Sequence, residues 1–177
     1  DDAHMALQAM GESQNQPLSL PRLRNLFRLH SPIRINRRSP GVGRTFLIEC
    51  CAADYVNETV VLRCVTELIR DYQADPNVFT TDEHPWADRP ALYFAIARVM
   101  PAVVRVLLQD AGASLTVEVE GKFRLVSDPN KFINGRFTPL GFAMALRKTE
   151  SERDKLPPYY ISKLGRCIRV LSETVSK

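Results

Sequence analysis

The sequence predicts an all-α protein whose helix pairs stack into a solenoid, with one β-hairpin finger and an N-terminal capping helix. Three observations predict it. A helix start recurs three times, each start is followed by a second amphipathic stretch, and 45% of the 177 residues are hydrophobic without any run long enough to span a bilayer. Neither helix of such a pair could bury its apolar face alone, so neighbouring pairs must share one core.

The N-terminal region divides into two parts. The opening "DDAHM" is typical of a cloning remnant, so we expect residues 1–16 to be a tag remnant and a disordered lead. Residues 17–42 are predicted to hold a helical cap and a basic linker. Ser19 is a suitable N-cap for a helix whose apolar residues recur at helical spacing, and the segment 31–44 reads as an extended linker.

The segment 43–177 is predicted to contain three units, at about 43–87, 88–135 and 136–177. The clearest start is Thr138-Pro139, because a Thr side chain can cap the first turn and Pro fits the first helical position. Small residues follow it, which suit a helix backbone lying close to a neighbour. Similar starts occur at Thr45 and Pro90, so the starts lie 45 and 48 residues apart.

Each start is followed by a second helix with one apolar stripe. The stripes contain Val61, Cys64, Val65, Leu68 and Ile69 in the first unit, Val103, Val104, Leu107, Leu108 and Ala111 in the second, and Ile161, Leu164, Ile168 and Leu171 in the third.

Three connections are unusually long. The first is a finger, residues 78–89, which carries the only tryptophan, Trp86. In the second, apolar and polar residues alternate around Gly121, which predicts a hairpin, and Asn134-Gly135 is a turn signal. The third, residues 147–158, is predicted to be a solvated charged loop.

The chain resembles ankyrin repeats. The family pattern T-P-L-H-x-A is matched by "TPLGFA" at 138–143 and more weakly by "PALYFA" and "TFLIEC"; the family's L-L-x-x-G-A-D-x-N ending is visible at 107–115 and 68–77. The resemblance covers residues from 43 to about 173. Three departures stand out: no His follows the starts, Gln73 stands where the family has a Gly with positive φ, and the spacing exceeds the family's period of about 33 residues.

This resemblance implies a non-catalytic scaffold or adaptor that binds another protein on its concave face and finger loops. Independently of the resemblance, Trp86 lies in a loop without a helical face to pack on, so we expect it to be an interface anchor. Counting from each start gives the implied contact positions: Arg44, Ala52, Ala53, Trp86, Arg89, Arg98, Asn134, Arg136, Phe137 and Leu146.

The alternative function is binding of nucleic acid or an anionic surface such as a lipid membrane. Seven arginines and no acidic residue lie between Glu12 and Glu49, and without these seven of its 24 basic residues the chain, with 20 acidic ones, would be mildly acidic. The basic patch comprises Arg22, Arg24, Arg28, Arg34, Arg37 and Arg38, within an Arg-rich segment that spans residues 22–44. A third alternative is a structural or self-associating domain of a larger protein.

The sequence argues against an enzyme, a cofactor or a metal. "GVGRT" at 41–45 lacks the Lys and the spacing of a phosphate-binding loop, and no metal-ligand spacing occurs. The four cysteines lie in apolar helical patterns without a CxxC motif, so we expect buried, reduced thiols. We therefore expect an intracellular protein, cytoplasmic or nuclear.

Overall fold

The structure is a computed structural model that describes residues 2–41, 43–152 and 156–176. Its described part contains eight helices and two strands. In chain order they are α1 (Asp2–Glu12), α2 (Leu20–Leu29), α3 (Phe46–Ala52), α4 (Glu58–Tyr72), α5 (Ala91–Ala97), α6 (Pro101–Gln109), β1 (Val119–Leu125), β2 (Asp128–Phe137), α7 (Pro139–Ser151) and α8 (Pro158–Val175). Within these residues, no helix is both long enough and apolar enough to cross a membrane.

The predicted class, an all-α ankyrin-like solenoid, is wrong. The chain between α6 and α7 forms a two-stranded antiparallel sheet, with strands of 7 and 10 residues, so the class is mixed. The physical reason is the alternation along β1, where Val119, Phe123 and Leu125 are buried and the residues between them are more exposed. This sheet is therefore part of the core and not merely a surface finger.

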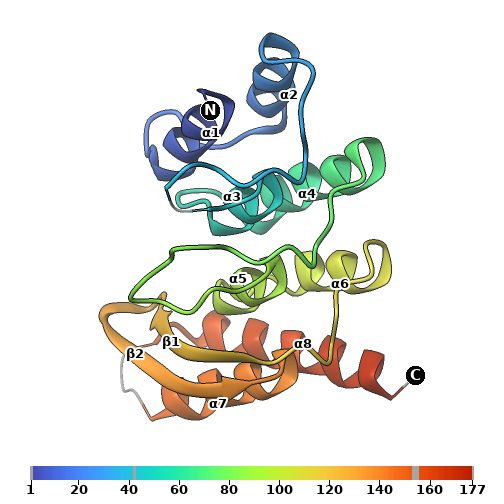
Figure 1. Cartoon of the computed structure of the whole chain (residues 1–177). Coiled ribbons are helices and arrows are strands. Elements are labelled where there is room, and N and C mark those ends of the chain that lie inside the picture. Colours follow the sequence, from blue (N-terminus) through green and yellow to red (C-terminus); the bar gives the residue numbers. More distant parts are fainter. Residues whose placement is uncertain (1, 42, 153–155, 177) are drawn as a thin grey trace.

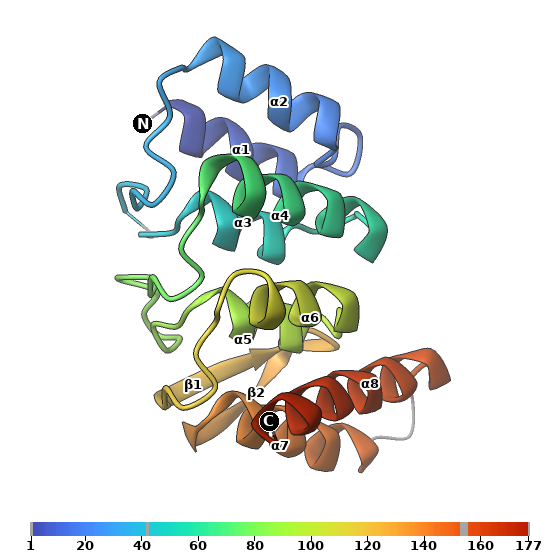
Figure 2. The same ribbon diagram turned by 90° about the vertical axis from the view of Figure 1, so that its right-hand side faces the viewer.

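The helices lie in two rows (Figures 1 and 2). The first row contains α1, α3, α5 and α7, and the second contains α2, α4, α6 and α8; each helix contacts its neighbour in the same row. Small residues permit close contact in the first row, where a Cβ added to Gly11 of α1 would lie 3.4 Å from the Cα of Ala53. One hydrophobic core runs through both rows.

Local sequence explains where several helices begin. The predicted caps are confirmed: the side chain of Ser19 accepts a hydrogen bond from the backbone N–H of Arg22, and that of Thr138 accepts one from Gly141. Thr45 caps α3 in the same way. At the end of α4, Gln73 has a φ of 57°, the positive value expected for the Gly that it replaces.

The N-terminal lead differs from the prediction. We expected residues 1–16 to be disordered, but residues 2–12 form α1, which packs against α2 and α3. Ala3 and Leu7 are buried, and the ring of His4 stacks on Phe46 with centroids 4.0 Å apart. These buried contacts, made by a segment that reads as a tag remnant, hold α1 against the rest of the fold.

The hairpin turns at residues 126–127, not at either of the predicted positions. Gly121 and Gly135 instead pair across the two strands. Both glycines give room to neighbours: a Cβ at Gly121 would lie 3.0 Å from the Cβ of Ala87, and one at Gly135 would lie 2.7 Å from the ring of Phe137. Here glycine marks close packing within a strand.

The predicted loop at 147–158 is also partly wrong. Residues up to Ser151 continue α7, and residues 153–155 lie outside the described part of the chain. Glu150 in this last turn is 1% exposed and accepts hydrogen bonds of 2.8 Å from the hydroxyl of Ser127 to both carboxylate oxygens. This contact with the hairpin turn accounts for the extra helical turn.

Candidate functional site

A groove of about 600 Å³ lies where five parts of the chain meet. They are the C-terminal part of α1, the helices α3 and α5, the finger at 78–89 and the tip of the hairpin. A second depression of about 630 Å³, between Met144 and Ile161 on α7 and α8, contains none of the predicted partner-binding residues. The groove is therefore the better candidate for a functional site.

The groove brings together six of the ten implied contact positions. Its lining includes Ala52 and Ala53 of α3, Arg98 at the end of α5, and Arg44, Trp86 and Arg89.

The other four positions are not part of it. Asn134, Arg136 and Phe137 lie on β2, where Arg136 forms an ion pair with Glu118 and Phe137 packs near Phe142. Leu146 is 1% exposed within the core. The structure therefore places Asn134, Arg136 and Phe137 on the hairpin, apart from the groove that holds the other six positions.

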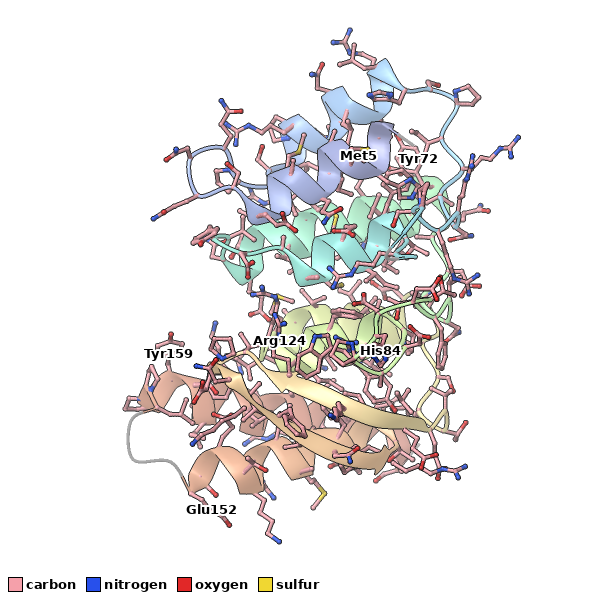
Figure 3. The ribbon with its side chains drawn as sticks, turned by 60° about the vertical axis from the view of Figure 1, so that its left-hand side comes forward. Met5, Tyr72, His84, Arg124, Glu152 and Tyr159 are labelled. Carbon is pink, nitrogen blue, oxygen red and sulfur yellow. The ribbon has the colours of Figure 1, made fainter. Side chains whose placement is uncertain are left out.

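Arginine and aromatic side chains stack in the groove. The guanidinium carbon of Arg89 lies 4.1 Å from the centroid of the Phe94 ring, and that of Arg44 lies 5.3 Å from the same centroid. Arg124, from β1, lies over Trp86 at 4.8 Å. Figure 3 shows Arg124 of the hairpin close to His84 of the finger, and both line the groove. Such cation–π contacts hold long side chains in defined positions.

Ion pairs fix two further groove arginines. The Nε of Arg44 donates to Glu83 at 2.6 Å, and its Nη2 lies 3.4 Å from the second carboxylate oxygen. Arg98 pairs with Asp54.

Arg89 has a different environment. Its Nη1 donates to the carbonyl of Ala87 at 2.6 Å, and burial lowers its pKa to about 10. The side chain therefore keeps its charge at neutral pH.

Glu49 is a buried carboxyl in this groove. It lies in the first turn of α3, and its residue is only 5% exposed. Burial raises the pKa of Glu49 to about 7; the charge of Arg44 opposes the rise, whereas Glu12 and Glu83 add to it. Neither Glu49 nor Arg124 is among the residues predicted from the sequence, although an acidic residue inside the apolar stretch "FLIECCA" is a signal for Glu49.

The finger is held in shape by backbone and side-chain hydrogen bonds. Thr80 N–H donates to the carbonyl of Arg89 at 3.1 Å and closes its base. The carboxylate of Asp88 accepts from the backbone N–H of Glu83 at 3.1 Å and from the Thr80 hydroxyl at 3.3 Å. These bonds place Glu83 where it can bind Arg44.

The arginines of the basic patch lie on α2 and the linker. Four of them bind protein groups: Arg22 donates to the Pro17 carbonyl, Arg24 pairs with Glu67, Arg28 donates to Asn25 and Arg38 donates to the Phe79 carbonyl. Arg34 and Arg37 are exposed. None of these six lines the groove.

The expected burial of the cysteines is confirmed. Cys50, Cys51, Cys64 and Cys167 are free and buried. Burial raises the pKa of both Cys51 and Cys167 to about 12, which disfavours their thiolates. Among the described residues, no group of three or more His, Cys, Asp or Glu side chains could hold a metal ion.

Comparison with known proteins adds no family assignment. No protein-family model matches the chain, and no curated protein matches it. The resemblance to ankyrin repeats therefore remains a prediction from the sequence.

Proposed function

We propose that this chain is a non-catalytic protein-binding module, a scaffold or adaptor, whose partner binds in the groove. The observation that carries the proposal is the arginine–aromatic lining, in which Arg44 and Arg89 lie beside Phe94, and Arg124 lies over Trp86. Arginine and aromatic residues are enriched in protein–protein interfaces and among their strongest contacts. The four free, buried thiols support an intracellular location as part of this proposal.

The groove side chains are already ordered without a partner. Ion pairs hold Arg44 and Arg98, and Arg89 donates to a backbone carbonyl. Because ordering a long side chain on binding costs about 0.5–1.5 kcal/mol, this arrangement lowers the cost of association.

Nucleic-acid or anionic-surface binding through the basic patch is the second candidate. The exposure of Arg34 and Arg37 favours it. Four of the other arginines bind protein groups instead, so their charges also serve the fold. Phosphate contacts would make that binding fall steeply with salt concentration.

The test begins with a pull-down from cell extract at low and high salt, followed by calorimetry with the captured partner. Trp86→Ala should weaken binding at least tenfold, as loss of an interface anchor does. Phe132→Ala is the matched control, because Phe132 is a 49% exposed aromatic residue outside the groove. Circular dichroism would check that each variant folds.

The charge-reversed double variant Arg34→Glu, Arg37→Glu separates the two candidate functions. We expect little change in partner binding at physiological salt. Loss of binding in this double variant, together with intact binding by Trp86→Ala, would reject the groove in favour of the basic patch.

A further inference from the structure

Glu49 lies at the end of the groove that α1 and α3 border. It belongs to α3, and Glu12 of α1 lines the same groove. Six consecutive residues of α3, Phe46–Cys51, are buried, and the other five are apolar. A carboxyl group in this position is costly unless something compensates its charge.

Among the described residues, no group supplies that compensation through a direct contact. Glu49 forms no hydrogen bond or ion pair through its side chain with any of the residues that the structure describes. Arg44 is the cation whose charge acts on it, but the guanidinium of Arg44 is engaged by Glu83. Glu49 is thus a residue that is only 5% exposed and lines the groove, and its carboxyl group has no direct partner among the described residues.

We propose that this end of the groove binds a positively charged side chain, Lys or Arg, of the partner protein, with Glu49 as its counter-charge. The inference rests on the proposed function and adds the chemistry of the partner. A cation here would meet Glu49 and have Glu12 and Glu83 nearby. Glu12 adds a second negative charge at this end of the groove, whereas the charge of Glu83 is balanced by Arg44.

Burial makes such a pair selective. Charges interact more strongly where water is largely excluded, so a cation that reaches Glu49 in this groove meets a carboxylate that solvent screens little. Arg98 cannot fill this role from within the chain, because it pairs with Asp54. The partner's side chain would complete a charge pair that the fold leaves open.

Binding of a cation should depend on pH. The groups whose charges act on Glu49 are Arg44, Glu12 and Glu83. Because burial raises the pKa of Glu49 to about 7, much of this carboxyl is protonated just below neutral pH. A cation favours the ionised form, so affinity should increase as pH rises from 6 to 8, with release of a proton.

The direct test is carbon-13 NMR of the glutamate carboxyl groups in the whole chain. Glu49→Gln identifies the Glu49 signal, and n-butylguanidinium serves as the probe at pH 8, with neutral n-butylurea as its control. We expect saturable movement of the Glu49 signal with the guanidinium only, together with a lowered pKa. Movement of equal size with butylurea, or no movement with either, would overturn the inference.

The captured partner provides the second test. Glu49→Gln should weaken its binding at least tenfold at pH 8 but much less at pH 6, whereas Glu120→Gln, an exposed carboxyl on β1, should have no effect. If Trp86→Ala weakens binding and Glu49→Gln does not, the charge inference fails and the proposed function stands. If neither substitution weakens it, both fail.

Discussion

The two rows of helices bury their residues in different ways. In the first row, α3 and α5 are each buried over six consecutive residues, Phe46–Cys51 and Ala91–Ile96. In the second row, α4 buries one stripe, Val61, Cys64, Val65 and Leu68, and exposes its opposite side. The inner first-row helices α3 and α5 are surrounded by other parts of the chain, whereas α4 of the second row has a solvent face.

This difference in burial determines how much folding free energy a polar residue costs in each row. On α4 a charged side chain can point to water, but α3 and α5 offer no such side. Tyr93 of α5 meets this constraint with hydrogen bonds from its hydroxyl, which lies 2.7 Å from the carbonyl of Phe137 and 3.0 Å from that of Val117. Glu49 of α3 has no such partner among the described residues, and since no buried side-chain oxygen there is left without a hydrogen bond, its carboxylate oxygens must reach the groove.

The largest effect should come from the apolar second row. Leu107→Ala in α6 removes a fully buried side chain and should destabilise the protein by about 2–5 kcal/mol in urea denaturation. Leu29→Ala in α2 makes the same chemical change at a 66% exposed site and should stay within about 0.5 kcal/mol. Equal losses in the two variants would show that the second row lacks the apolar interior described above.

Glu49→Gln should stabilise the protein, but only when the wild-type carboxyl is ionised. The folded-state pKa of about 7 exceeds the unfolded value of 4.5, so wild-type stability falls as pH rises through this range. A Gln side chain cannot ionise, so the variant does not lose this stability and should be more stable than the wild type at pH 8 by up to about 3 kcal/mol. Urea denaturation of both proteins at pH 5 and pH 8 measures this difference in unfolding free energy. A difference that does not grow with pH would contradict the prediction.

Tyr93→Phe should destabilise the protein by about 1–3 kcal/mol, because it leaves the carbonyls of Phe137 and Val117 without their hydroxyl donor. Burial also raises the pKa of Tyr93, so its hydroxyl stays protonated at neutral pH. Tyr55→Phe, at a 62% exposed position, is the control and should be neutral. Thermal unfolding compares the two, and a neutral Tyr93→Phe would mean that the hairpin does not need this bond.

The smallest expected effect comes from the loss of one N-cap hydrogen bond in each row of helices. Thr45 and Ser19 each accept a backbone N–H at 3.3 Å, but Thr45 is 1% exposed and Ser19 is half-buried. Thr45→Ala should cost about 2 kcal/mol and Ser19→Ala about 0.5, the two ends of the range for lost caps. A larger loss for Ser19→Ala in urea denaturation would break the comparison between the rows.

Features that depend only on residues close together in the chain could be predicted from the sequence. A cap needs only a Thr or Ser and the next turn of helix, so Ser19 and Thr138 could be identified from their neighbours. Leu107 lies on an apolar stripe and is fully buried, as its spacing predicted.

The hairpin could not be placed from its own residues. Gly121 and Asn134-Gly135 read as turns, but tertiary contacts with Ala87 and Phe137 explain those glycines. The groove shares this difficulty, because its walls come from segments far apart in the chain. Counting from each helix start found Arg89 and Arg98 but misplaced Arg136, and it could not find Arg124, since β1 has no counterpart in the other units.

The finger is fastened on both sides by backbone hydrogen bonds, and this has a consequence for redesign. On one side Thr81 N–H donates to the carbonyl of Gly43 at 3.2 Å, and on the other Ala87 N–H donates to the carbonyl of Lys122 at 2.9 Å. These two bonds involve no side-chain atom, so they do not depend on which side chains stand at Trp86, Arg89 and Arg124. A library varied at Trp86, Arg89 and Arg124 would therefore change what the groove recognises while keeping its frame.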